Sequence, residues 1–119
     1  MFLQLAHTKL SVFLKSRDLV LECYKLSRNF PADERFALIQ QIRRASCSVH
    51  LNIAEGCSRK SSIERKRFFE IARGSLIEVD TAIGLAVNLD YITLEKLDSI
   101  KILIRENFKM ISVMISPDN

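Results

Sequence analysis

The chain has 119 residues, a net charge of +4 and 48% hydrophobic residues, but only three glycines and two prolines. This length is typical of one domain with its own core, and so few turn residues argue against a sandwich or barrel of short strands. Three cysteines without ligand-like spacing indicate reduced thiols in a cytoplasmic protein, and no apolar run is long enough to cross a bilayer, so we expect no membrane partner.

Two amphipathic helices are predicted in the first half of the chain, at about residues 12–29 and 33–56. Pro31 separates them, Asp33 is expected to cap the second, and Gly56 is expected to end it in the left-handed conformation. Apolar residues recur every three or four positions in both helices, which is the period of a buried helical stripe. The predicted stripe residues are Leu19, Cys23, Leu26, Phe30, Leu38, Ile42, Ala45, Val49 and Ile53.

Two further helices are predicted at about residues 62–89 and 93–115. Ser61 and Glu64 have the spacing of a capping box at the start of the third, while Thr93 and Glu95 indicate the start of the fourth. The apolar period continues through both helices. Its members are Phe69, Ala72, Leu76, Val79, Ile83 and Ala86, then Leu97, Ile100, Ile104, Phe108, Ile111 and Ile115.

These four helices are joined by short connections, which predicts an all-α, antiparallel up-down-up-down four-helix bundle occupying residues 1–119 as a single domain. The fourth helix has a wider apolar arc than one stripe needs, because Ile102, Leu103, Met110 and Met114 extend it. This arc is either a subunit interface of a homo-oligomer or a broad core stripe, and the pattern alone favours neither.

A polar stripe is predicted along the second helix, where Arg44, Ser48, Asn52 and Glu55 follow one another at spacings of four, four and three. On the third helix, Arg73 precedes Gly74 and Ser75 at the edge of the apolar stripe, and a mid-helix glycine suggests close approach of another backbone. One interpretation is a pocket in which Glu55 is a base and the arginines hold an anion. We favour a structural network in which Arg73 pairs with Glu55 and the amide and hydroxyl groups satisfy each other.

Other signs of catalysis or of metal or cofactor binding are scarce. His7 and His50 lie in different segments, and neither has a cysteine or carboxylate at metal-ligand spacing. No nucleophile motif or phosphate loop is present. We therefore expect no enzyme, metal or cofactor, and place His50 on a helix surface or an interface.

A short basic segment carries the whole net charge of the chain. Residues 59–67 hold five basic side chains against the single Glu64, a net charge of +4. The segment lies in the predicted loop and at the start of the third helix, where the helix N-terminus also attracts phosphate. It is either a nucleic-acid interface without sequence preference or a solvated charged corner. The five residues are Arg59, Lys60, Arg65, Lys66 and Arg67.

Several motifs together resemble the 23S rRNA-intervening-sequence protein family, over about residues 10–115. These motifs are Phe30-Pro31, Glu34-Arg35, Gln41-Ile42-Arg43-Arg44-Ala45, Asn52-Ile53-Ala54-Glu55-Gly56, Phe68-Phe69 and Ala72-Arg73-Gly74-Ser75, followed by Glu78. The resemblance implies a small bacterial four-helix bundle that assembles as a homopentamer. The family is also similar to the accessory variability proteins of diversity-generating retroelements, which bind nucleic acid. The resemblance implies no catalytic role for the signature residues in these motifs. This chain also departs from the family, because it has His50 where members usually have proline.

Three hypotheses about the function remain to be tested. The leading hypothesis is a non-enzymatic homo-oligomer that binds RNA or DNA weakly through the basic segment, repeated in each subunit. The alternative is a protein-interaction scaffold that docks a partner protein and has no nucleic-acid role. An enzyme is the third, and it requires a cleft in which Glu55 and Arg73 face solvent.

Overall fold

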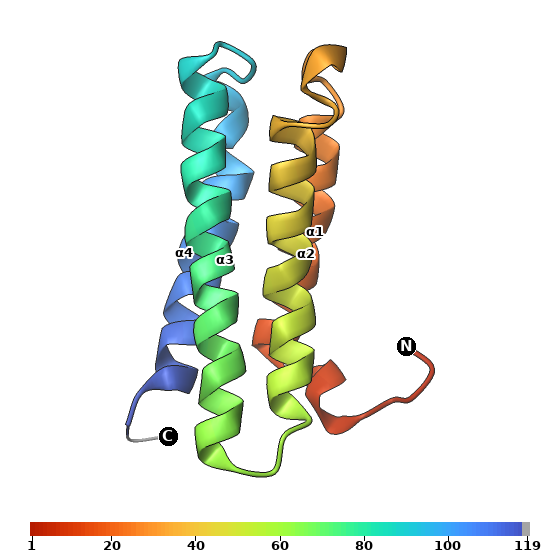
Figure 1. Cartoon of the computed structure of the whole chain (residues 1–119), viewed down its shortest axis with the longest axis vertical. Coiled ribbons are helices and arrows are strands. Elements are labelled where there is room, and N and C mark those ends of the chain that lie inside the picture. The colour runs from red at the N-terminus through yellow and green to blue at the C-terminus, as the bar shows by residue number, and fades with distance from the viewer. Residues whose placement is uncertain (118–119) are drawn as a thin grey trace.

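The computed structural model describes residues 1–117 and consists of helices joined by short connections (Figure 1). Four α-helices are present: α1 (Ser11–Ser27), α2 (Leu38–Cys57), α3 (Ser62–Asn88) and α4 (Asp98–Ile115). Three short 3₁₀ helices accompany them: η1 (Ala6–Lys9), η2 (Ala32–Glu34) and η3 (Leu94–Leu97). The described residues form no β-strand, which confirms the predicted all-α chain with four helices.

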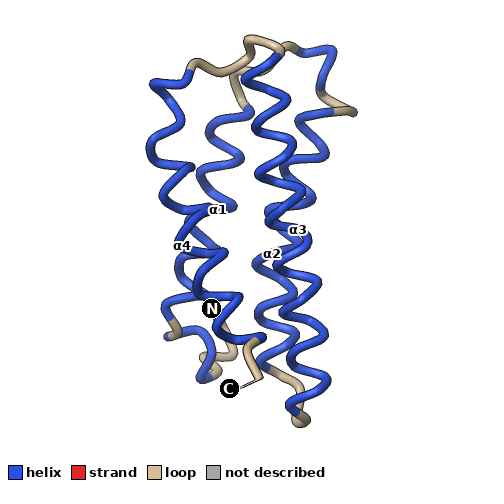
Figure 2. The backbone as a smooth tube through the Cα atoms, turned by 90° about the vertical axis from the view of Figure 1, so that its left-hand side faces the viewer, coloured by secondary structure: helices blue, strands red, loops and turns tan. Residues whose placement is uncertain are grey.

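The helices form a bundle of two layers. Figure 1 shows α3 in front of α4 and α2 in front of α1, and the view turned by 90° in Figure 2 places α1 and α4 on one side and α2 and α3 on the other. The α2–α3 pair makes the most extensive helix contact. The α2–α3 loop lies at one end of the bundle together with η1 and the end of α4 (Figure 1), so this end gathers segments that are far apart in the sequence.

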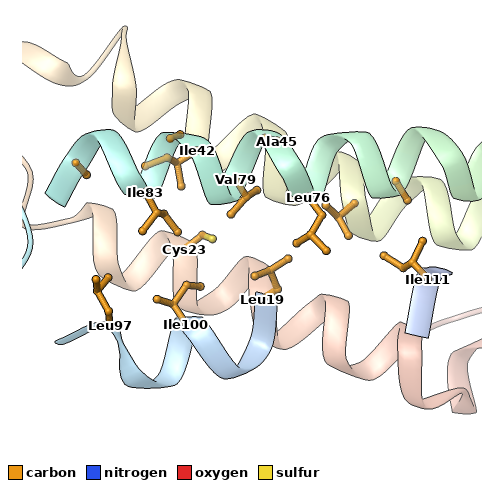
Figure 3. Close-up of a cluster of buried hydrophobic side chains, with 14 of the residues drawn as sticks. Leu19, Cys23, Ile42, Ala45, Leu76, Val79, Ile83, Leu97, Ile100 and Ile111 are labelled. Carbon is orange, nitrogen blue, oxygen red and sulfur yellow. The ribbon is translucent and has the colours of Figure 1, made fainter. Parts of the chain in front are cut away.

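The hydrophobic core lies along the axis between the four helices, where labelled side chains from each helix point toward one another (Figure 3). Every stripe residue predicted on α3 is buried, and so are most of those on α1 and α2. Leu26, Leu38, Ile104 and Ile115 are half-buried at its edge. Periodicity therefore identified the core face of these helices correctly, because a helix in a bundle buries one stripe.

The start of α2 differs from the prediction. Asp33 does not cap this helix, because residues 32–34 form η2 and α2 begins only at Leu38. Glu34 takes the capping role from outside the helix: its Oε2 accepts a hydrogen bond of 3.0 Å from the Leu38 amide. Its Oε1 accepts one of 3.1 Å from the hydroxyl of Tyr91. The Glu34 carboxylate therefore joins the α1–α2 connection to the connection between α3 and α4.

The predicted left-handed end of α2 at Gly56 is also wrong. The helix continues to Cys57, and no described glycine has a positive φ. The predicted cap of α3 is confirmed, because Ser61 Oγ accepts a hydrogen bond of 3.1 Å from the Glu64 amide. Among the helix ends, a positive φ occurs instead after α3, where Asp90 has φ 62° and the Tyr91 amide donates to the Ala86 carbonyl at 2.9 Å. This is the Schellman pattern, with aspartate in the place that glycine usually occupies.

The buried face of α4 is rotated from the predicted one. Phe108 was expected in the core but is 43% exposed, whereas Asn107 is fully buried. The Asn107 Nδ2 donates to the carbonyl oxygens of Lys15 at 3.1 Å and Leu103 at 2.8 Å. The Asn107 side chain therefore connects α4 to α1. Because Asn107 faces the core, the adjacent Phe108 lies at the surface.

Candidate nucleic-acid interface and the adjoining polar contacts

The basic segment forms the α2–α3 loop and the first turns of α3, but two of its five cations already have intramolecular partners. Arg59 pairs with Glu55 one turn earlier, and its guanidinium carbon lies 4.8 Å from the ring centre of Phe68. Arg65 Nη1 donates to the carbonyl oxygens of Arg59 and Lys60, both at 3.1 Å. These contacts tie the loop to the end of α2 and the start of α3, and the ion pair neutralises the charge of Arg59 within the chain.

Three cations remain for a partner outside the chain. Lys60 and Arg67 are exposed and Lys66 is half-buried, and within residues 1–117 none of the three side chains makes an ion pair. They flank the N-terminus of α3, whose free amides add positive potential. The corner therefore presents a small cationic surface suited to phosphates rather than to base edges.

Part of the predicted polar stripe of α2 lies against α3. The Oγ atoms of Ser48 and Ser75 are 2.7 Å apart, and Asn52 Nδ2 donates to the Ser48 carbonyl at 2.8 Å and to its Oγ at 3.0 Å. Nearer the other end of the bundle, Gln41 Nε2 donates to Glu78 at 3.3 Å. Ser48, Asn52, Ser75 and Glu78 thus belong to polar contacts that bridge the α2–α3 layer.

Three members of the predicted network lie outside these contacts, and the first, Glu55, pairs with Arg59. Arg73 does not pair with Glu55: it faces α4, where its Nη1 donates to Ser112 Oγ at 3.4 Å. Arg44 is exposed, and its side chain makes no hydrogen bond or ion pair within residues 1–117. Arg73 lies on the face of α3 that contacts α4, whereas Glu55 pairs with Arg59 at the end of α2. The two side chains therefore do not line a common cleft.

Gly74 has no close neighbour in the chain. A Cβ built on it would meet no atom within 4 Å, so the backbone approach expected there is absent within the chain. Gly56 is the glycine that permits close packing: a Cβ there would stand 2.5 Å from Phe69 Cε1. The side chain missing from Gly56 therefore allows α2 to pack against the start of α3.

Sequence reasoning missed a buried contact of His50. This side chain is half-buried, and its Nδ1 lies 2.7 Å from Ser16 Oγ on α1. Its ring centre is 4.4 Å from that of Phe13. Burial, then the charges of Arg17 and His7, lower the pKa of His50 from its ordinary value of 6.5. The i, i+3 spacing of Phe13 and Ser16 was a local signal of one helix face, but nothing in the sequence related that face to α2.

The described residues contain no group of three or more His, Cys, Asp or Glu side chains placed to hold a metal ion. The three cysteines form no disulfide, and burial raises the pKa of Cys23 to about 12. None of the described helices combines the length and apolar character needed to cross a membrane.

The fold defines a helical-bundle protein with a basic corner on its α2–α3 loop. A sequence model of the 23S rRNA-intervening sequence protein family matches residues 8–113, and the chain belongs to this family. A crystal structure of a protein of unknown function from the S23 ribosomal protein family of Bacteroides thetaiotaomicron is similar, with a TM-score of 0.78 and 26% identity, covering 88% of this chain and 98% of that chain. The comparison with curated proteins found no match.

Proposed function

We propose that this chain is a non-enzymatic, cytoplasmic homo-oligomer of antiparallel up-down-up-down bundles that binds RNA or DNA weakly and without sequence preference. A pentamer is the assembly that the family resemblance implies. The observation that carries the proposal is the set of three cations without ion-pair partners, Lys60, Lys66 and Arg67, beside the N-terminus of α3. The link of the family to ribosomal RNA genes makes RNA the first ligand to test.

Phosphate contacts explain both the affinity and the lack of sequence preference. Each cation that neutralises a phosphate releases condensed counterions, so binding falls steeply with salt but is nearly equal for different sequences. One corner supplies only a few such contacts. Repetition of the corner in every subunit raises the overall affinity when one strand reaches several corners.

A gel-shift titration with single-stranded and duplex RNA at low and physiological salt tests the proposal. We expect binding by the wild type at low salt and its loss in the variant Lys60→Ala/Lys66→Ala/Arg67→Ala. A matched control is Lys25→Ala/Lys96→Ala/Lys101→Ala, which removes the same charge from exposed positions outside the basic segment. Absence of wild-type binding at low salt, or equal losses in both variants, would overturn the proposal.

A protein-interaction scaffold is the second candidate, and the exposed apolar side chains of α4 favour it. Ile102 is 55% exposed and Val113 56% exposed, and their spacing of eleven residues places both on one face of α4, where a partner would cover them. We expect Ile102→Glu to leave the monomer folded and to reduce assembly or partner capture. Light scattering of the variant, together with absence of nucleic acid in the wild-type protein purified from its native host, would support the scaffold over the nucleic-acid proposal.

A further inference from the structure

A groove of about 520 Å³ lies at the end of the bundle that carries the α2–α3 loop. Three separate parts of the chain line this open groove: η1 with the residue before α1, the junction of α2 and α3, and the last turns of α4. Its volume is within the range of small-molecule sites. Its apolar lining is contributed by Ala6, Leu10, Cys57, Phe69, Val113 and Met114.

The charged side chains that line this groove, Arg65 and Lys66, are both cationic. His7 and Ser62 complete the polar lining, which contains no carboxylate. Four other grooves of the described chain each include at least one Asp or Glu. Lys66 makes no ion pair within residues 1–117, and Arg65 uses Nη1 for loop carbonyls that carry no net charge. The positive charge at this groove is therefore uncompensated.

We propose that this groove binds a small organic acid with an apolar body, such as an alkyl or aryl carboxylate or sulfonate. The apolar lining removes a hydrocarbon body from water, while Lys66 and Arg65 attract the acid group through charge-assisted hydrogen bonds. This site differs from the nucleic-acid surface, because a phosphate backbone has no apolar body and because Lys60 and Arg67 do not line the groove.

The adjacent residues Lys66 and Arg67 provide a matched test. Both substitutions to alanine remove one charge from the start of α3, but only Lys66 lines the groove. Titration of the full chain with the fluorescent aryl sulfonate anilinonaphthalene sulfonate should give saturable binding that decanoate displaces and decylammonium does not. We expect Lys66→Ala to weaken binding about fivefold and Arg67→Ala by less than about twofold.

A second variant tests the preference for an anion by placing a negative charge in the groove without disturbing the core. Val113 is 56% exposed, so Val113→Glu should fold normally while it places a carboxylate in the groove. We expect this variant to lose binding at least tenfold, because its charge repels the acid. Circular dichroism and thermal unfolding of the variant establish that it is folded.

Cysteine labelling gives an independent readout. Cys57 lines the groove, whereas Cys47 lies 3.6 Å from the Tyr24 hydroxyl between α1 and α2. Burial raises the pKa of the Cys57 thiol, so alkylation with iodoacetamide is performed at mildly alkaline pH and followed by peptide mass spectrometry. We expect decanoate to slow alkylation of Cys57 and to leave Cys47 unchanged.

Three results would overturn the inference: no saturable binding of the sulfonate, equal weakening by Lys66→Ala and Arg67→Ala, or displacement by adenosine monophosphate and not by decanoate. The last result would assign the groove to the nucleic-acid surface. Failure of the RNA gel shift leaves these measurements unaffected, so the two proposals fail separately.

Discussion

Gly56 on α2 packs directly against the ring of Phe69 on α3. A Cβ at Gly56 would stand 2.5 Å from Phe69 Cε1 and 3.1 Å from the carbonyl oxygen of Arg65. Phe69 is only 5% exposed, so neither the ring nor the backbone can move aside freely. This contact sets the distance between α2 and α3 just before the loop that carries the basic segment.

Substitution of Gly56 by alanine should therefore destabilise the bundle. Overpacking of a tight site costs about 1–3 kcal/mol, which exceeds the gain of about 1 kcal/mol in helix propensity. Gly74→Ala is the control, because its Cβ meets nothing within 4 Å and should stabilise α3 by up to about 1 kcal/mol. Urea unfolding at one protein concentration measures both, and a Gly56→Ala variant as stable as Gly74→Ala would contradict this packing.

Asp90→Gly should stabilise the protein. Asp90 has φ 62° at the end of α3, and a left-handed conformation costs a residue with a Cβ about 1 kcal/mol more than glycine. We expect a higher melting temperature for Asp90→Gly and a lower one for Asp90→Ala, since alanine tolerates the left-handed conformation less well than aspartate. A lower melting temperature for the glycine variant would indicate that the Asp90 carboxylate has a stabilising role of its own.

Asn107→Leu should raise the free energy of unfolding by roughly 1 kcal/mol, whereas Asn107→Ala should lower it by about 2 kcal/mol. Asn107 is fully buried, and its Oδ1 meets no donor from the described residues. The two carbonyls that accept from its Nδ2 lie within helices, so they remain bonded when the amide is removed. Chemical denaturation of the two variants measures the effect, and leucine more damaging than alanine would contradict it.

Stability should fall as the pH decreases through the ordinary His50 pKa of 6.5. Burial lowers the pKa of His50 in the folded state, so the unfolded chain takes up a proton first and acid favours unfolding. Ser16 Oγ donates to the Phe13 carbonyl and accepts from His50 Nδ1, which leaves Nε2 to titrate. Between pH 7.5 and pH 5, the free energy of unfolding should change less in His50→Gln than in the wild type. The difference between these two changes should be roughly the contribution of one titrating histidine. An unchanged pH dependence would exclude His50 as its source.

Glu55→Gln should strengthen RNA binding if the basic corner is the interface. The substitution frees the Arg59 guanidinium from its ion pair and adds one positive charge to the corner. The slope of log affinity against log salt should become steeper by up to about one unit. Stability should change by less than about 0.5 kcal/mol, because the pair is exposed. Weaker binding in this variant would show that Arg59 acts only as part of the pair.

Local patterns predicted the helices and most of the core. The stripe from Phe69 to Ala86 is buried throughout, and the Ser61 cap forms as expected, because both depend on spacing within one helix. Parts of the candidate site also followed from spacing, since Ser48 and Asn52 are one turn apart and do bond to each other. The pairing of Arg73 with Glu55 was wrong, because spacing within each helix does not reveal which neighbour a side chain faces.

The sequence by itself determined the family, the helical class and the position of the positive charge along the chain. The tertiary structure decided how each helix is rotated about its axis, which turned Arg73 toward Ser112 and buried Asn107 in place of Phe108. It also brought η1, the start of α3 and the end of α4 together around one cationic groove. The apolar period is a property of consecutive residues within one helix. The rotation of each helix and its contacts with the others depend instead on how the side chains of four helices fill a common core.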